Sequence, residues 1–243
     1  MSVRHYAPGQ HTGGNPYVRH YGPRSLGVDW WLSGGITAAN CLAAYKPKGA
    51  ASLAASYDNN AAPGNGLADG TYDCTAIAAP LWDAATGWSN SNSGWLNSNL
   101  IPNPNQTYSM FVRFSDSVGA TVVISAAQEN AGGNNFRFGI YSVSAGKVVY
   151  QNQPLTVASR TVAPELVAGT LGFSGPACYR NGATDGSIAI TAAGTNTTRY
   201  LYILANNLSG SFQLLGTIKI QYLSIYNTPI SAAQQAALTA ATA

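Results

Sequence analysis

The sequence predicts an all-β protein: an antiparallel jelly-roll β-sandwich with a short C-terminal helix and an extended N-terminal arm. Three observations support this fold class. Many short segments alternate apolar and polar residues, Gly, Asn and Pro separate them, and a single convincing helix pattern lies near the C-terminal end. A chain of 243 residues can bury its own core without disulfides or metals. We expect an arm over residues 1–35 and one sandwich over residues 36–243.

The clearest strand pattern covers residues 107–114. Its apolar face is formed by Tyr108, Met110, Val112 and Phe114. Residues 136–141 alternate in the same way, and residues 200–205 carry large side chains on both faces, so that strand should be covered on both sides. Over residues 216–226 the apolar phase slips by one residue near Tyr222. Such a slip predicts a β-bulge at this point.

The helix pattern begins after Pro229. Ser231 and Gln234 have the spacing of a capping box ahead of an Ala-rich stretch that includes Leu238. The other Ala-rich stretch, residues 50–55, is interrupted by Ser and lies among strands, so we expect strand or loop there. The three cysteines, which are Cys41, Cys74 and Cys178, have no CxxC spacing and are predicted to be small buried hydrophobes.

Charge is scarce and unevenly placed. Charged residues make up 9% of the chain, against roughly 25% in an average soluble protein. The first 28 residues hold three Arg, all three His and no acid, whereas the remainder is neutral. Three arginines are too few for a nucleic-acid footprint, no apolar run is long enough to span a membrane, and the N-terminus has no signal-peptide pattern. A surface with so little charge indicates either that the chain works at low concentration or that partners cover its surface.

The arm contains a repeat. Residues 3–8 (VRHYAP) and residues 18–23 (VRHYGP) are identical at five of six positions. One interpretation is that the repeat arose by chance in a disordered tail. The other is that the arm holds two copies of a docking peptide, each of which offers an Arg fork, an imidazole and an aromatic ring on a chain stiffened by Pro. The predicted docking residues are Arg4, His5, Tyr6, Arg19, His20, Tyr21, Trp30 and Trp31.

From about Cys41 to Ala241 the chain resembles the concanavalin A-like, laminin-G-like jelly-roll domains of bacterial and phage-derived proteins. The residues that carry the resemblance are Ala43–Tyr45, Lys48–Ser52, Ala85–Trp88, Tyr108–Phe114, Tyr179–Gly182 and the C-terminal segment from Gly216 to Leu238. The resemblance implies a sandwich whose last strand is followed by a short helix. It also implies a hairpin at Tyr179–Gly182. The arm has no counterpart in these domains.

Catalytic residues are not found in a recognisable pattern. Hydrolase members of the resembled group carry alternating acids on one strand, whereas none of the nine acids here is two residues from another. All three histidines lie in the arm, so a Ser-His-Asp triad would require the arm to fold into a cleft. We therefore expect no enzymatic activity. A polysaccharide-degrading enzyme is the least favoured hypothesis.

Two kinds of binding residue remain. Asp58, Asp69 and Asp73 are calcium candidates, because domains of the resembled group often hold calcium at a loop-rimmed edge with Asp and Asn oxygens; Asp and Asn are also ordinary turn residues. Otherwise no cofactor is expected. Trp88 and Trp95, on or beside a predicted loop rim, are candidates for stacking on sugar rings.

These features lead to two functional hypotheses. The first is a structural virion-surface protein of a bacteriophage, a capsid decoration or a tail or fibre component. In that case its partners are other virion proteins and copies of itself. The alternative is a lectin-like module that binds glycans, including cell-surface glycans, without catalysis. Neither hypothesis involves nucleic acid or a membrane.

Overall fold

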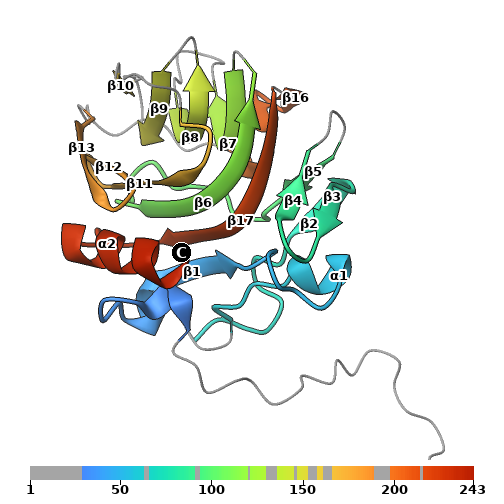
Figure 1. Ribbon diagram of the computed structural model, residues 1–243, viewed down its shortest axis with the longest axis horizontal. Coiled ribbons are helices and arrows are strands. Elements are labelled where there is room, and N and C mark those ends of the chain that lie inside the picture. The colour runs from blue at the N-terminus through green and yellow to red at the C-terminus, as the bar shows by residue number, and fades with distance from the viewer. Residues whose placement is uncertain are drawn as a thin grey trace, which may run out of the picture.

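The computed structural model describes residues 29–62, 66–90, 94–119, 121–129, 136–144, 147–152, 158–160, 166–188, 198–213 and 216–243. Within them the chain forms two stacked, largely antiparallel sheets, and a C-terminal helix packs on the outside of one (Figure 1). This arrangement confirms the predicted all-β sandwich with a late helix. None of the described helices is long and apolar enough to cross a membrane.

The first sheet has the strand order β13-β12-β11-β6-β17-β4-β3, and β1 also pairs with β17. Its strands are β1 (Cys41–Tyr45), β3 (Leu81–Asp83), β4 (Gly87–Ser89), β6 (Ser109–Val118), β11 (Gly169–Ser174), β12 (Ala177–Arg180), β13 (Ala183–Ser187) and β17 (Thr217–Tyr226). The long strands β6 and β17 lie side by side at its centre. At the predicted hairpin, Asn181 and Gly182 both have positive φ and join β12 to β13, as an Asn-Gly type I′ turn requires.

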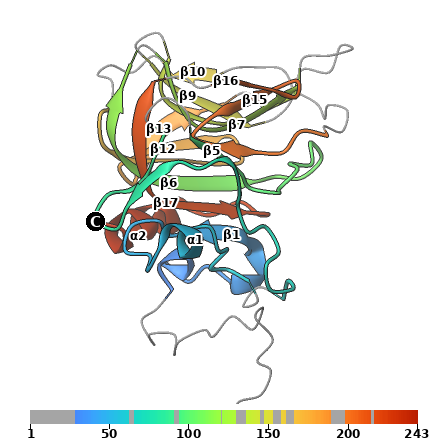
Figure 2. The same ribbon diagram turned by 90° about the vertical axis from the view of Figure 1, so that its right-hand side faces the viewer.

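The second sheet has the order β10-β9-β8-β7-β14-β5-β2, with the hairpin β15–β16 attached to β7. Its strands are β2 (Thr75–Ala78), β5 (Trp95–Asn97), β7 (Thr121–Glu129), β8 (Phe136–Ser144), β9 (Lys147–Asn152), β10 (Ala158–Arg160), β14 (Tyr202–Ile203), β15 (Asn206–Leu208) and β16 (Ser211–Gln213). Figure 2 shows this sheet above the layer that contains β6 and β17.

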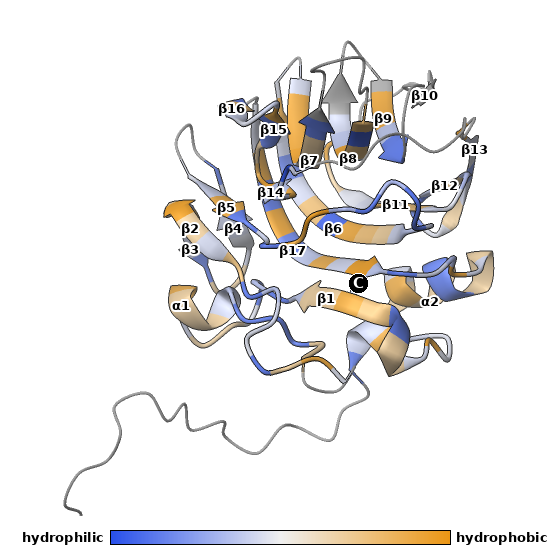
Figure 3. Ribbon diagram, turned by 180° about the vertical axis from the view of Figure 1, so that it is seen from behind, coloured by the Kyte–Doolittle hydropathy of each residue, from blue (hydrophilic) through white to orange (hydrophobic). Residues whose placement is uncertain are grey.

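The main core fills the space between the two sheets. As the alternation predicts, Met110, Val112 and Phe114 of β6 are buried there, and they face Phe138 and Ile140 of β8. The register between β6 and β17 shifts between Ile220 and Tyr222, which confirms the predicted bulge. Figure 3 shows the apolar stretches of β6, β17 and β1 on neighbouring strands.

A second, smaller core lies on the outer face of the first sheet. Phe111 of β6 points away from the main core and packs in this outer core, whose members include Trp31, Tyr226 and Leu238. The segment η1 (Trp30–Leu32) and the helix α2 (Ala232–Ala241) cover it. The capping box predicted at the start of α2 is present, with Ser231 and Gln234 exchanging hydrogen bonds.

The outer core corrects the predicted boundary of the arm. Trp31 is buried, and the ring of Trp30 packs edge-on against Tyr222 with centroids 5.1 Å apart. Residues 29–35 therefore pack on the sandwich, and the rings of Trp30 and Trp31 contact it. Residues 1–28, with the other predicted docking residues, lie outside the described part of the chain.

Two local predictions were wrong. Residues Leu53–Ser56 form a one-turn helix, α1, because the Ser52 side chain accepts a hydrogen bond from Ala55 N and caps it. The strand expected over residues 200–205 is only two residues long, since Leu204 adopts positive φ and ends β14. The chain then turns and continues as β15.

Candidate functional site

The buried position of Trp88 excludes it as a sugar platform. Its ring is fully buried in the main core, between Tyr45 and Tyr57, and its indole N–H donates to Ser56 Oγ at 2.7 Å. No face of this ring reaches the surface, so the prediction that Trp88 stacks on a glycan was wrong.

Trp95 in β5 is also covered, but by another aromatic ring near the surface. The ring of Phe212 in β16 stacks on the indole with centroids 5.1 Å apart and an interplanar angle of 22°. Tyr202 in β14 packs against the same indole at 4.5 Å. Phe212 itself is 54% exposed. We call Trp95, Tyr202 and Phe212 the aromatic ledge. Its solvent-facing ring is that of Phe212, a residue that no sequence pattern indicated.

The hairpin β15–β16 holds Phe212 in this position. Ser209 and Gly210 both have positive φ and connect the two strands in two residues, the geometry of a type I′ turn. Asn207 lies opposite Phe212 in the hairpin, and its amide donates to Tyr200 O and accepts from Gly210 N. Tyr200 is 41% exposed. The ledge is thus built on paired strands rather than on an unsupported loop.

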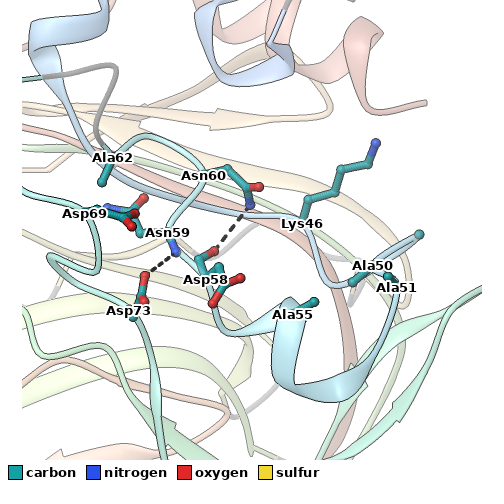
Figure 4. A pocket seen from close by; sticks show the side chains of 11 residues that line it. Lys46, Ala50, Ala51, Ala55, Asp58, Asn59, Asn60, Ala62, Asp69 and Asp73 are labelled. Carbon is teal, nitrogen blue, oxygen red and sulfur yellow. Dashed lines mark hydrogen bonds between the residues drawn. The ribbon is translucent and has the colours of Figure 1, made fainter. Parts of the chain in front are cut away.

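A polar pocket of about 290 Å³ lies elsewhere on the molecule, beside α1 (Figure 4). Its charged lining consists of Asp58, Asp69, Asp73 and Lys46, and its apolar lining of small Ala and Gly residues. The pocket is near the lower end of the range for ligand sites, roughly 300–1,000 Å³. The three aspartates named from sequence in two separate stretches therefore line one pocket.

Asn59 forms the wall of this pocket and is saturated with hydrogen bonds. Its side-chain oxygen accepts from Ala44 N and Ala61 N, and its amide nitrogen donates to Leu42 O and Thr71 O, all at 2.9–3.0 Å. Its backbone N–H donates to Asp73 Oδ1 at 2.8 Å, as Figure 4 shows. Asn59 thus ties β1 to the loop that carries Asp73, and its amide has no capacity left for a ligand.

The pocket does not form a metal centre of the usual kind. Among the residues that the structure describes, no three His, Cys, Asp or Glu side chains converge closely enough to hold an ion. Calcium binding by Asp58, Asp69 and Asp73 together with backbone oxygens stays a prediction.

The cysteines are buried, as predicted, and form no disulfide. Burial raises the pKa of the Cys41 and Cys74 thiols well above the usual value. Both thiols are therefore protonated at neutral pH and unsuited to nucleophilic or metal chemistry.

Comparisons with known proteins reveal likeness in structure but not in sequence. The sequence matches no known protein family and no curated protein. The sialidase of Trypanosoma rangeli superposes over 83% of this chain with a TM-score of 0.53 and 11% identity. The binding domain of Paraclostridial Mosquitocidal Protein 1 superposes over 84% with a TM-score of 0.54 and 10% identity.

This chain spans only part of those proteins, 32% of the sialidase and 52% of the binding domain. At such low sequence identity the structural similarity is evidence of a shared fold and of nothing more. It shows that the described chain shares a β-sandwich fold with a part of each of those two proteins.

Proposed function

We propose that this chain is a glycan-binding module without catalytic activity, and that the aromatic ledge is its binding surface. The observation that carries the proposal is the stacking of Phe212 on Trp95, which leaves the outer ring more than half exposed. The occurrence of the same fold in a toxin's binding domain supports a binding role.

An exposed ring supported from below suits the apolar face of a sugar. Aromatic stacking contributes about 0.5–1.5 kcal/mol beyond the buried area, and a ring already fixed by packing loses little entropy on binding. Asn97 lies opposite Tyr202 across β5 and β14, and Gln213 follows Phe212. Amide side chains of this kind both donate to and accept from sugar hydroxyls.

A glycan array with the purified chain tests the proposal. Replacing Phe212 by Ala should weaken binding several-fold, since one stacking interaction of about 1 kcal/mol is worth about a factor of five. Val118→Ala is the matched control, because Val118 is also an exposed apolar residue, 65% accessible, but lies on β6. It should leave binding unchanged.

Three results would contradict the proposal. An array without hits would remove its support. Full binding by Phe212→Ala together with loss of binding by Asp58→Asn would move the site to the polar pocket. Turnover of a glycan that depends on a single acid would make the chain an enzyme.

The virion-surface role, the partners in a phage particle and docking through the arm stay predictions. Neither of the two proteins compared above is a phage protein. Co-purification of the chain with intact particles, before and after deletion of residues 1–28, would test that role separately from glycan binding.

A further inference from the structure

We propose that the chain has a second binding surface, on the outer face of the first sheet, which takes a carboxylate or sulfate group of an acidic glycan. Its central residues are Lys46, Arg113 and Tyr222, which we call the basic patch. The aromatic ledge is built on strands of the second sheet. This inference therefore goes beyond the proposed function and can be tested separately from it.

Two cationic side chains approach the ring of Tyr222 in β17. The Lys46 ammonium lies 5.9 Å from the ring centroid, within the range of a cation–π contact. Arg113 is the residue opposite Tyr222 on β6. Burial raises the pKa of Tyr222, and the positive charge of Arg113 opposes that rise. The ring of Trp30 packs edge-on against Tyr222 at 5.1 Å and supports it. Tyr222 thus brings an ammonium and a guanidinium from two separate segments to one place.

The guanidinium of Arg113 is held in position and keeps most of its donors. Its Nε donates to Gln221 Oε1 at 3.1 Å, which uses one of its five N–H groups. Arg113 is half-buried, so its charge is less screened than one on an open surface. The two terminal nitrogens can donate parallel hydrogen bonds to one carboxylate or sulfate, and such charge-assisted bonds are about twice as strong as neutral ones.

The elements around the patch carry more bases than acids. Strands β1, β4, β6, β11 and β17 and the segment 46–49 hold the charged residues Lys46, Lys48, Arg113, Lys219 and Asp116. Lys219 pairs with Asp116 at 2.7 Å. Lys48 lies beside the patch, because its backbone N–H donates to Gln221 O at 3.3 Å. Within the described part of the chain, Lys46, Lys48 and Arg113 form no ion pair.

The acids of the neighbouring segments lie to the side of the patch. Asp83 in β3 accepts hydrogen bonds from two backbone N–H groups of its own turn. Asp29 is exposed and precedes η1. The three aspartates of the polar pocket share Lys46 as a lining residue, but Figure 4 shows the Lys46 side chain extending away from them. An anion would be repelled by the pocket and attracted to the side of Lys46 that faces Tyr222.

The size of the patch favours an acidic sugar over a nucleic acid. Three cations are too few for a nucleic-acid footprint, which needs a denser basic stripe. One carboxylate or sulfate matches one guanidinium fork and one ammonium. Tyr222 and Gln221 are half-buried beside these cations, and hydroxyl and amide groups of this kind pair with sugar hydroxyls.

The test uses an oligogalacturonide and a sulfated galactan oligosaccharide, each compared with its neutral form after carboxyl reduction or desulfation. By titration calorimetry the full chain should bind a charged form about tenfold more tightly than its neutral form, the ratio that about 1.4 kcal/mol gives. Arg113→Gln should remove most of this preference, and Lys46→Gln should lower it about threefold. Arg137→Gln is the matched control, since it removes the same charge from β8 of the second sheet. It should leave the preference unchanged.

Salt and the ledge variant give two further readouts. The preference for the charged form should shrink as ionic strength rises, and it should depend less on salt in Arg113→Gln than in the wild type. Phe212→Ala should leave the ratio between the charged and neutral forms unchanged, because the ledge lies in the other sheet. Thermal unfolding of each variant verifies that it is folded.

Four results would overturn one proposal or both. Equal binding of charged and neutral forms by the wild type, or a loss in Arg137→Gln as large as that in Arg113→Gln, would overturn the basic patch and leave the ledge in place. Binding of single-stranded DNA in preference to both glycans, lost in Arg113→Gln, would overturn the glycan as its occupant. Binding of a charged form that Phe212→Ala does not change, without binding of any neutral form, would overturn the ledge alone. Failure of the wild type to bind any form would overturn both.

Discussion

The hydroxyl of Tyr226, at the end of β17, donates to the main-chain carbonyl of Trp31 at 2.9 Å. This bond joins two residues that are 195 positions apart, and both are buried in the outer core beside Phe111. It fastens the segment η1 to the last strand of the sandwich. The fold of the described chain therefore begins before residue 36.

Two truncations should separate the arm from the sandwich. Deletion of residues 1–28 should leave stability unchanged, because the outer core keeps Trp31. Deletion of residues 1–35 removes Trp31 and leaves the Tyr226 hydroxyl without its acceptor, so the free energy of unfolding should fall by about 3–5 kcal/mol, as for Trp→Ala in a core. Urea unfolding of both truncated chains measures the difference. Equal stability of the two would show that η1 does not support the sandwich.

Replacement of Trp88 should affect folding and not binding. Trp88→Ala removes a fully buried ring and should cost about 3–5 kcal/mol. Ser56→Ala leaves the ring in place but removes the acceptor of its indole N–H, and should cost about 1–3 kcal/mol. Chemical denaturation gives both values, with Val118→Ala as an exposed control that should change stability by less than about 0.5 kcal/mol. A stable Trp88→Ala chain with altered glycan binding would refute this assignment.

Asn59 should be far more important for stability than its neighbour Asn60. Asn59→Ala removes the hydrogen bonds that the side chain makes to two backbone N–H groups and two carbonyls, and a buried group that loses such a bond costs about 1–3 kcal/mol. The expected loss is about 3 kcal/mol or more. Asn60 is exposed, so Asn60→Ala should cost less than about 1 kcal/mol. Similar unfolding midpoints for the two variants would contradict the role of Asn59 as a tie between β1 and the pocket loop.

Alkaline pH should destabilise the sandwich. Burial raises the pKa of Tyr45, Tyr150 and Tyr226 above the usual value near 10. Above about pH 10 the unfolded chain releases these protons while the folded chain keeps them, so stability is complete below that pH and falls as pH rises. The slope is about 1.4 kcal/mol per pH unit for each tyrosine that stays protonated. Urea unfolding between about pH 8 and pH 12 measures it. Ionisation of all tyrosines before unfolding, seen by tyrosinate absorbance, would contradict the prediction.

Features that depend on neighbours in the chain could be predicted from the residue pattern alone. Alternation along β6 decided which side chains face the main core, because side chains of a strand point to opposite faces in turn. The capping box of Ser231 and Gln234 and the turn at Asn181 and Gly182 are likewise made by residues within a few positions of each other. The residue types at these positions are therefore enough to predict the cap and the turn.

The burial of individual aromatic residues and the position of the pocket depend on contacts between distant parts of the chain. Trp88 and Phe212 both lie in short strands with little periodicity, and one is buried while the other is exposed because of strands far away in the sequence. The same holds for Trp31, which sequence placed in the arm, and for Asp58 and Asp73, which meet at one pocket through Asn59. Local pattern cannot specify such contacts, because burial of an isolated side chain depends on which distant elements pack over it.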